Sequence, residues 1–492
     1  MLKKFGSDER GVFAIMVAVV LIPVLLAIGF AVDLGRYMKA ESYLQELADS
    51  ASLALAAARE KDKTKLTTMA NEFVGANDTV PFVDDIHVSS LVTNDNLIDL
   101  GLNAQLKTYF MGLANIHTMN VNANAEAIRA VSGSVEVALV LDNTYSMIDS
   151  DGAGSTKIAT LRTAATGLVT ELFKNKDADV RIAVVPYADY VNVGTGNRNQ
   201  PWVSVPADYT TVPAEKVCTT KTTKSVCVKT NPTYACTKDV DGVIVPTTCG
   251  GGCAEYQDQT VAPYQSCTGG GSGTSYTWYG CVGSRTTGEL RLSDLVPATP
   301  YPGYLNVKDK PACPTAITPL SKDQATVTKA VSEMNAEFKK GSYVYQPLTY
   351  IPSGLIWGLN VLSSTAPFTE GLSYDKTNIK PRKVVVLMTD GENTLRLNTA
   401  DGKHLVPSGT AANKLKQMQQ TDTDTRAICK TIKDNKIELF TIAFNLDSED
   451  AKSLLSSCAT DADHFYDAKD SAALMAAFSG IAQSLTQVRL AR

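Results

Sequence analysis

The residues best suited to chemistry follow a short, mostly apolar run at Glu136–Leu141 and begin with Asp142. An apolar run of this length, bounded by a polar loop, predicts a strand that is buried on both faces, with Asp142 at its carboxyl end. Thr144 and Ser146 follow at alternate positions, so the stretch offers one carboxylate and two hydroxyl oxygens. Such ligands suit a hard divalent cation such as Mg²⁺. The alternative interpretation is a strand that simply ends in a polar turn, because short motifs often match by chance.

Two later segments carry similar groups. The apolar run Val384–Met388 is followed by Thr389 and Asp390, so a second predicted strand ends in an Asp within a tight turn. Thr349 offers a hydroxyl immediately before a helix predicted at Ile351–Leu362. Open α/β sheets bind ligands outside the carboxyl ends of their strands, which is where both Asp side chains are expected.

The elements that would position these groups alternate from residue 134 onward. Strands are predicted at Val135–Leu141, Val180–Pro186, Lys383–Met388, Ile437–Phe444 and His464–Tyr466, and helices at Ser155–Phe173, Ile351–Leu362, Gly409–Asp434 and Ser471–Val488. This alternation predicts an α/β domain at 134–488, with a doubly wound, mainly parallel sheet that helices cover on both faces. A Cys- and Gly-rich insertion at residues 195–345 interrupts the domain.

Ten cysteines indicate the compartment of this domain. Eight lie in the insertion and two follow it: Cys218, Cys227, Cys236, Cys249, Cys253, Cys267, Cys281, Cys313, Cys429 and Cys458. An even number in a loop-rich segment indicates disulfides in an oxidising space. Zinc is the alternative, because the spacing of Cys249 and Cys253 is permitted for zinc ligands, but no second tight pair faces them and the four histidines are scattered. We therefore expect disulfides.

The insertion is also rich in glycine and poor in apolar periodicity, so its core would be too weak to hold it without disulfides. Within it, the sequence from Asp239 to Gly242 mimics the start of a calcium loop but lacks the remaining EF-hand ligands, and we interpret it as a turn. For Trp278 and Trp357, core packing and a binding role are both open interpretations.

The N-terminus predicts a membrane anchor. Residues 11–32 are uncharged and mostly apolar, which is long enough for a transmembrane helix. A cleaved signal peptide is the alternative, but the run is too long and no A-x-A site follows it. Positive charges in the short N-terminal flank predict that residues 1–10 lie in the cytoplasm, and the cysteines predict that everything after residue 33 lies outside it. The net charge of −5, without a basic block, argues against nucleic acid as a partner.

Residues 33–132 are expected to form a pilin-like helix and a small α+β module. The segment Gly35–Arg59 is amphipathic, with one face predicted to be buried: Ala40, Leu44, Leu47, Ala48, Ala51, Leu55 and Ala58. After it we expect a helix at Lys63–Val74 and strand-like runs at Asp85–Val92 and Met119–Ala130.

Two parts of this N-terminal region resemble TadG-type proteins of the Tad (tight adherence, Flp) pilus system. They are GVFAIM at residues 11–16 with the apolar run that follows, and YLQELADSASLALAAA at residues 43–58. Pilin-like precursors carry a Glu five residues after the Gly that precedes the cut, and Met16 stands at that position here. The difference favours a permanent anchor.

The three metal-binding candidates, in their order along the chain, resemble the metal-ion-dependent adhesion site of von Willebrand factor type A domains. That pattern is D-x-S-x-S after the first strand, a Thr five residues before a Gly, and an Asp in a T-D-G turn. The resemblance implies these metal ligands: Asp142, Thr144, Ser146, Thr349 and Asp390. Thr144 replaces the usual Ser but preserves the hydroxyl.

These resemblances imply a non-enzymatic component of Tad/Flp pilus biogenesis or adhesion in a bacterial envelope, with its bulk periplasmic or extracellular. The site would hold Mg²⁺, or Mn²⁺ or Ca²⁺, and would bind a carboxylate from a protein partner, a pilus component or surface receptor. No G-x-S-x-G elbow, H-E-x-x-H or P-loop is present. The alternative is a structural envelope-tethering protein whose metal only stabilises the fold. A link between Cys429 and Cys458 would clamp the edge of the sheet.

Overall fold

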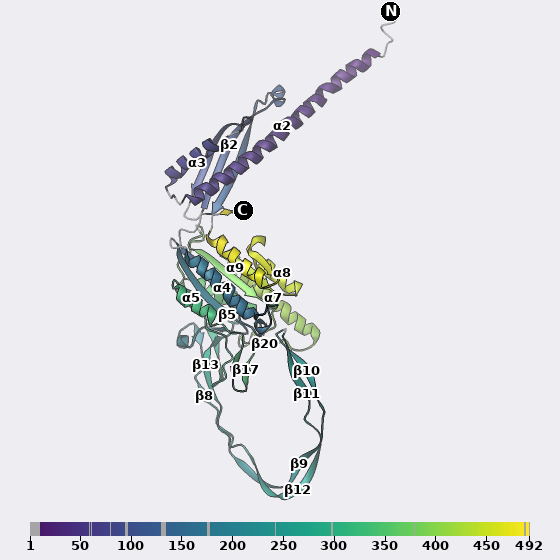
Figure 1. Ribbon diagram of the computed structural model, residues 1–492, viewed down its shortest axis with the longest axis vertical. Helices are drawn as coiled ribbons and strands as arrows, with labels where there is room; N and C mark the ends of the chain where they lie inside the picture. The colour runs from purple at the N-terminus through teal and green to yellow at the C-terminus, as the bar shows by residue number, and fades with distance from the viewer. Residues whose placement is uncertain are drawn as a thin grey trace, which may run out of the picture. The chain divides into compact units, whose positions relative to one another are not determined.

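The computed structural model (Figure 1) describes residues 10–58, 60, 62–78, 80–93, 97–128, 134–174, 178–241, 243–296, 299–377, 379–486 and 489–491. Several sequence predictions fall partly outside these residues. The parts concerned are the cytoplasmic tail except Arg10, the end of the segment Gly35–Arg59, the end of the run at Met119–Ala130, Gly242, and the end of the helix at Ser471–Val488. The chain forms two compact units, Met1–Gly133 with Ser484–Arg492 and Ser134–Gln483.

The first unit is built on one long helix, α2 (Arg10–Ala57), which runs without a break through Pro23. Its part Val19–Ala57 is long and apolar enough to cross a membrane, and no other described helix meets that criterion. Six of the seven residues predicted on its buried face are buried. The exception is Ala58, which is exposed because the helix ends one residue before it.

A four-stranded antiparallel sheet in the order β1-β2-β3-β23 packs with α2 in this unit. Its elements are α3 (Lys63–Asn77), β1 (Asp84–Thr93), β2 (Leu97–Lys107), the 3-10 helix η1 (Met111–Ala114), β3 (Thr118–Ile128) and β23 (Arg489–Ala491). The sequence analysis missed β2, although its inward-facing leucines Leu100, Leu102 and Leu106 complete the core between sheet and helix.

The second unit contains a sheet whose central strands are parallel and follow the order β22-β21-β18-β4-β5. These strands are β4 (Ser134–Asp142), β5 (Asp179–Tyr187), β18 (Arg382–Thr389), β21 (Glu438–Phe444) and β22 (Phe465–Ala468). Their ends lie within three residues of the predicted ones. Every residue of β18 is buried, as expected for a strand covered on both faces.

Short strands extend the sheet beyond β5 through β6, β13, β14 and β7, while β15 pairs antiparallel with β5 and β8 pairs with β13. Their bounds are β6 (Val191–Asn192), β7 (Val203–Ser204), β8 (Tyr209–Thr210), β13 (Ser275–Val282), β14 (Tyr301–Val307) and β15 (Thr318–Ser321). Two small hairpins complete the strands, β16 (Phe338–Lys340) with β17 (Tyr343–Tyr345) and β19 (Arg396–Leu397) with β20 (His404–Leu405).

The helices of this unit are α4 (Lys157–Lys174), α5 (Gln324–Ser332), α6 (Ile351–Leu362), α7 (Ala411–Asp434), α8 (Glu449–Cys458) and α9 (Ser471–Thr486), with 3-10 turns η2 (Tyr145–Ile148), η3 (Thr195–Asn197), η4 (Gly288–Leu292) and η5 (Ala462–His464). One hydrophobic core joins α6, α7 and α8 to alternate residues of the central strands, such as Val140, Val385 and Leu439. The intervening residues, such as Leu139 and Val386, point to the other face and are also buried.

Helix α6 lies very close to the sheet because it carries two glycines on its inner face. A Cβ atom at Gly354 would lie 2.6 Å from the ring of Tyr187, and one at Gly358 would lie 2.5 Å from Val140 Cγ2. Trp357 of the same helix and Trp278 of β13 are both buried in this core. Core packing therefore accounts for the two tryptophans.

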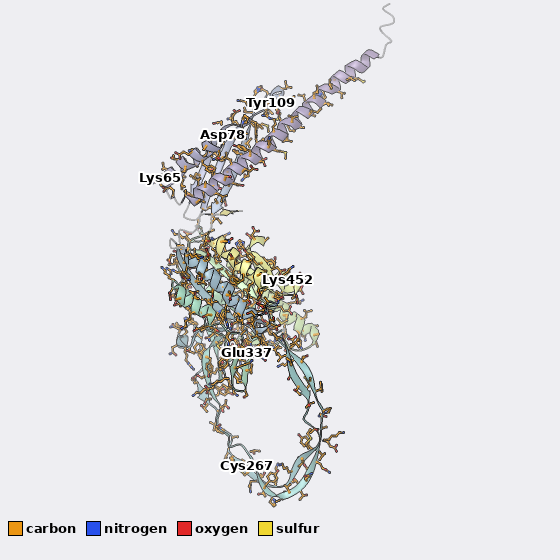
Figure 2. The ribbon with its side chains drawn as sticks, viewed as in Figure 1. Lys65, Asp78, Tyr109, Cys267, Glu337 and Lys452 are labelled. Carbon is orange, nitrogen blue, oxygen red and sulfur yellow. A yellow bond between two sulfur atoms is a disulfide. The ribbon has the colours of Figure 1, made fainter. Side chains whose placement is uncertain are left out.

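The insertion contains an extended arm, Val217–Thr268, made of two antiparallel ladders in series. These are β9 (Val217–Thr230) with β12 (Cys253–Thr268), and β10 (Thr233–Val240) with β11 (Val243–Gly250). Nearly all of the arm's side chains are exposed. Figure 1 shows the arm running out from β8 and β13, through β9 and β12, and back along β10 and β11. Figure 2 labels Cys267, which lies where the ladder of β9 and β12 begins.

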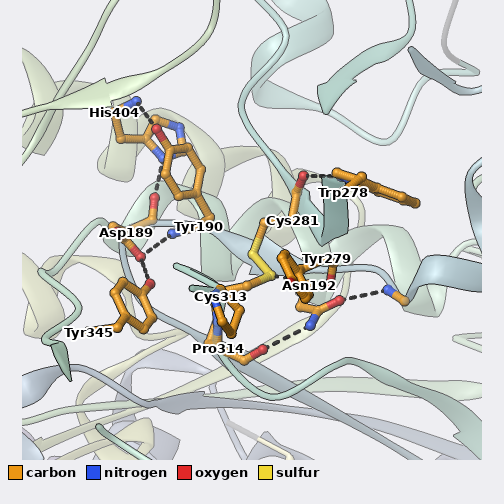
Figure 3. The surroundings of a disulfide bond; sticks show 12 residues. Asp189, Tyr190, Asn192, Trp278, Tyr279, Cys281, Cys313, Pro314, Tyr345 and His404 are labelled. Atoms are coloured by element: carbon orange, nitrogen blue, oxygen red, sulfur yellow. Dashed lines mark hydrogen bonds between the residues drawn. A yellow bond between two sulfur atoms is a disulfide. The ribbon is translucent and has the colours of Figure 1, made fainter. Parts of the chain in front are cut away.

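All ten cysteines form disulfides, which confirms the prediction of a disulfide framework and excludes zinc binding by Cys249 and Cys253. The pairs are Cys218–Cys267, Cys227–Cys253, Cys236–Cys249, Cys281–Cys313 and Cys429–Cys458. The last pair joins α7 to α8, on either side of β21, as expected of a clamp at the sheet edge. Figure 3 shows the pair that joins β13 to Cys313.

Candidate metal centre

The five predicted ligands come together at the carboxyl ends of β4 and β18. Leu141 pairs with Met388, so Asp142 and Thr389 stand side by side at the ends of the two neighbouring strands. The loop after β4 carries the other two donors of its motif, and Asp390 follows β18 directly. We call Asp142, Thr144, Ser146, Thr349 and Asp390 the metal centre.

Hydrogen bonds connect four of these side chains into one chain of contacts. The hydroxyl of Thr144 donates to Asp142 Oδ1 at 2.6 Å, and the hydroxyl of Ser146 donates to Asp390 Oδ1 at 2.6 Å. The two hydroxyl oxygens lie 2.9 Å apart. When each hydroxyl gives its single proton to its carboxylate, no proton remains between the two oxygens. Lone pairs then face each other, which is an environment that a cation stabilises.

Thr349, the fifth predicted ligand, lies near Ser146, because one carboxylate, that of Asp241, is within 3.3 Å of both hydroxyls. Its side chain is buried immediately before α6. A Cβ atom built at Gly391 would lie 3.8 Å from the Thr349 hydroxyl and 4.0 Å from that of Ser146. Both hydroxyls therefore lie close to the backbone of Gly391.

The centre holds more negative charge than its surroundings neutralise. Burial, and then the nearby charge of Asp390, raise the pKa of Asp142 to about 7. Asp390 itself receives a hydrogen bond from Lys157 Nζ at 2.8 Å. Asp142 Oδ2 accepts from the hydroxyl of Thr389 at 2.6 Å. One lysine thus faces two buried carboxylates, and a divalent cation would remove the remaining repulsion.

A third carboxylate, which the sequence analysis did not assign to the site, comes from the arm. Asp241 accepts hydrogen bonds from the hydroxyls of Thr349 at 3.0 Å and Thr394 at 3.1 Å, and its Oδ2 lies 3.3 Å from the hydroxyl oxygen of Ser146, whose proton goes to Asp390. Burial, and then the charge of Asp390, raise its pKa to about 6. The turn that we predicted at Asp239–Gly242 was the one signal for this residue.

The opening next to the metal centre is rich in acidic side chains. Six of them lie around it together with Lys157: Asp149, Asp239, Asp241, Asp390, Glu392 and Asp447. Such a cleft concentrates cations. Among the described residues, no group of three or more His, Cys, Asp or Glu side chains is arranged to hold a metal ion. The hydroxyl donors of Thr144, Ser146 and Thr349 therefore distinguish this candidate from a site made only of carboxylates and imidazoles.

A second buried polar cluster lies at Asp189, Tyr345 and His404 (Figure 3). His404 Nδ1 contacts the backbone carbonyl of Asp189, which can only accept, so Nδ1 carries the proton. Nε2 then accepts from the Ser284 hydroxyl at 2.8 Å. Burial lowers the pKa of His404 to about 4 and raises that of the Asp189 carboxyl to about 7.

Residues 11–60 match the Tad family model, "Putative Flp pilus-assembly TadE/G-like". The N-terminal segment is therefore of the TadE/G-like type found in Flp pilus assembly, which confirms the Tad resemblance. No curated protein matches the chain.

Several solved structures share limited similarity with the chain. The pilus adhesin SpaC of Lactobacillus rhamnosus GG matches 83% of this chain at 13% identity with a TM-score of 0.34, and this chain covers 35% of it. The vWF domain of the type V pili tip protein Mfa5 of Porphyromonas gingivalis matches 72% of this chain at 11% identity and a TM-score of 0.33, with 95% of that domain covered. The PilB minor pilin of Streptococcus sanguinis matches 82% at 10% identity and a TM-score of 0.34, with 78% of it covered.

Proposed function

We propose that this chain is a membrane-anchored component of Tad/Flp pilus biogenesis or adhesion that binds a protein partner through a metal-ion-dependent adhesion site. The observation that carries the proposal is the convergence of five predicted ligands from three separate segments at the ends of β4 and β18. The TadE/G-like segment supports the pilus context.

The order of the strands supports a doubly wound domain of the von Willebrand factor type A class. The connection from β4 to β5 moves to one side of the sheet, and the later connection from β5 to β18 returns across β4 to the other side. The direction of strand succession therefore reverses between β4 and β18. Doubly wound sheets bind ligands at this point, and the metal centre lies there.

Each residue of the metal centre has a distinct part in the proposal. Asp142 and Asp390 supply the charged ligands, while Thr144, Ser146 and Thr349 supply neutral hydroxyl oxygens. Thr389 and Lys157 hold the outer oxygens of the two carboxylates. Mg²⁺, Mn²⁺ or Ca²⁺ bound by so many neutral oxygens would keep positive charge for a partner's carboxylate.

The proposed role is recognition and not catalysis. The groups around the centre are hydroxyls and carboxylates that are hydrogen-bonded to one another, and none of them is placed to act as a nucleophile or general base. The helix α2 would anchor the protein in the envelope, with the N-terminus cytoplasmic and the bulk periplasmic or extracellular. Five disulfides suit that compartment. The partner would be a pilus component or a surface receptor that presents an acidic side chain.

Asp142→Asn tests the proposal, because it removes one charged ligand while keeping the size of the buried side chain. Asp149→Asn, an exposed position of the same loop, is the matched control. In the full chain purified in detergent, we expect Asp142→Asn to weaken Mn²⁺ binding at least about tenfold. In the producing bacterium, it should abolish pilus-dependent adhesion at unchanged protein level. Adhesion and Mn²⁺ binding equal to those of Asp149→Asn would refute the proposal.

The second candidate is a structural envelope-tethering role in which the metal only stabilises the fold. One observation favours it: Asp241 completes the set of donors from within the chain, and closed donor sets are typical of structural metal sites. Chelation distinguishes the two roles. A lower melting temperature with unchanged adhesion indicates the structural role, whereas loss of adhesion below the melting temperature indicates recognition.

A further inference from the structure

Asp241 stands at the tip of a tight hairpin, β10–β11. The two strands pair without a register shift from Thr233 and Gly250 to Val240 and Val243, so the turn comprises two residues. Asp241 has a positive φ of 54°, which the Asp-Gly sequence favours at a hairpin turn of this length. The disulfide Cys236–Cys249 links the same two strands. The hairpin therefore presents one carboxylate on a stiff support.

Among the described residues of this hairpin, only Val240 is buried, and Asp241 is half-buried. Val240, next to the turn, has 9% of its surface exposed, whereas the other residues of β10 are exposed or half-buried. Withdrawal of the tip from the metal centre would therefore uncover little apolar surface. The two strands of the hairpin are firmly paired with each other, but few apolar contacts attach the hairpin to the metal centre.

The contacts of Asp241 are those expected of a ligand that approaches from outside. Its carboxylate accepts hydrogen bonds from Thr349, which is one of the five predicted metal ligands, and from Thr394. Its Oδ2 lies 3.3 Å from the hydroxyl oxygen of Ser146, a second predicted ligand. Asp241 is 95 residues from Ser146 and 108 from Thr349 along the chain. A carboxylate on a loop tip that reaches these hydroxyls occupies the side of the centre that faces the cleft.

We propose that Asp241 is an internal ligand of the metal centre, which takes the place of a partner's carboxylate and must leave before the partner binds. This inference rests on the proposed function. The partner that fits is a protein with an Asp or Glu at the tip of a tight turn, because that is the group which the hairpin imitates. Displacement exchanges one carboxylate for another, so the charge at the centre is the same before and after.

The test uses the full chain in detergent, first with Mn²⁺ alone and then with acetate added. Acetate stands for the carboxylate of a partner. Asp241→Gly removes the ligand and is compatible with the positive φ, while Asp241→Asn removes the charge and tolerates the same backbone. Asp239→Asn is the matched control, since it removes the same charge from an exposed position of the same strand and lines the same cleft. Asp142→Asn reports on the metal centre itself.

Mn²⁺ affinity and the water-proton relaxation per bound ion are the two readouts. We expect Asp241→Gly and Asp241→Asn to weaken Mn²⁺ binding about tenfold and Asp239→Asn to leave it within about twofold. In Asp241→Gly, relaxation per ion should rise because water gains access, and acetate should reverse that rise. In the wild type, acetate should have no effect.

The outcomes separate the inference from the proposed function. Equal Mn²⁺ affinity and relaxation in the wild type and Asp241→Gly, with binding lost in Asp142→Asn, would overturn the internal ligand and leave the metal centre standing. An equal loss of affinity in Asp239→Asn and Asp241→Asn would also overturn it, since it would indicate a general charge effect. Failure of the wild type to bind Mn²⁺ would overturn both.

Discussion

The buried ion pair between Glu136 and Lys383 offers the sharpest test of how the sheet positions the metal centre. The two residues are direct neighbours in the register of β4, which ends at Asp142, and β18, which ends at Thr389 immediately before Asp390. Their side chains are 0% and 2% exposed, and Lys383 Nζ lies 2.9 Å from Glu136 Oε2. The pair therefore fixes the alignment of these two strands at the end opposite to the centre.

Each charge has further partners that would be left behind if the other charge were removed. Lys383 Nζ also donates to the carbonyls of Leu362 and Leu372, and Glu136 Oε1 accepts from the amide of Leu372 at 2.7 Å. Removal of one charge leaves the other buried without a counter-ion, which costs about 3 to 5 kcal/mol. Such a loss is a large part of the total stability of a domain, which is about 5 to 15 kcal/mol.

The prediction is a strong coupling in a double-mutant cycle. We expect Glu136→Gln and Lys383→Met each to lower the unfolding free energy by about 3 to 5 kcal/mol, and the double variant to lose less than either alone, because no charge then stays unpaired. All three tryptophans of the chain, Trp202, Trp278 and Trp357, lie in the unit Ser134–Gln483. Urea unfolding followed by tryptophan fluorescence therefore reports on this unit alone. Additive losses in the double variant would refute the reasoning.

Three further predictions use the same fluorescence assay. Gly358→Ala should destabilise the unit by about 1 to 3 kcal/mol through its clash with the sheet, whereas Gly167→Ala, an exposed helix position with open space, should stabilise it by up to about 1 kcal/mol. Replacing Cys429 and Cys458 by Ala removes a disulfide between residues with a sequence separation of 29. We expect the unfolding free energy to fall by about 3.5 kcal/mol, and a decrease below about 1 kcal/mol would contradict this prediction. The pKa of His404 is about 6.5 in the unfolded chain and about 4 in the folded protein. Lowering the pH from about 6.5 to about 4 should therefore decrease the unfolding free energy of the wild type by about 3 kcal/mol relative to that of His404→Gln. If the difference in unfolding free energy between the two proteins does not change across this pH range, burial does not lower the pKa of His404.

The parallel strands could be predicted from sequence because burial on both faces requires continuous apolar runs. The apolar run of β4 predicts a buried strand by itself, without reference to a neighbouring strand. The predicted end of the strand at Asp142 follows because Asp142 is the first polar residue after that run. Helix α8 was missed, since its buried residues are only Ala451, Leu454, Leu455 and Cys458 and its capping Ser448 resembles loop sequence. Strand β2 was missed because Gly101 and Asn103 interrupt its alternation.

The metal centre could be predicted in part for a related reason. Asp142 ends β4 and Asp390 directly follows β18. A parallel sheet brings such strand ends to one edge, so local motifs predict that the two side chains lie close together. Asp241 has no such relation to the sheet. Its hairpin is short and mostly exposed, and no apolar pattern in the arm specifies where its tip lies. Its place at the centre depends on tertiary contacts that no local motif encodes.

The disulfides of the arm explain how a long exposed insertion can still deliver one side chain to a defined place. The links Cys218–Cys267 and Cys227–Cys253 join β9 to β12, and Cys236–Cys249 joins β10 to β11. Each link therefore stiffens a ladder, and none of them ties the arm to the central sheet. The tip is held at the metal centre by hydrogen bonds to the Asp241 carboxylate and by the burial of Val240. An arm that is covalently stiff along its length but reversibly attached at its tip can release the centre as a unit, which is what exchange with a partner's carboxylate requires.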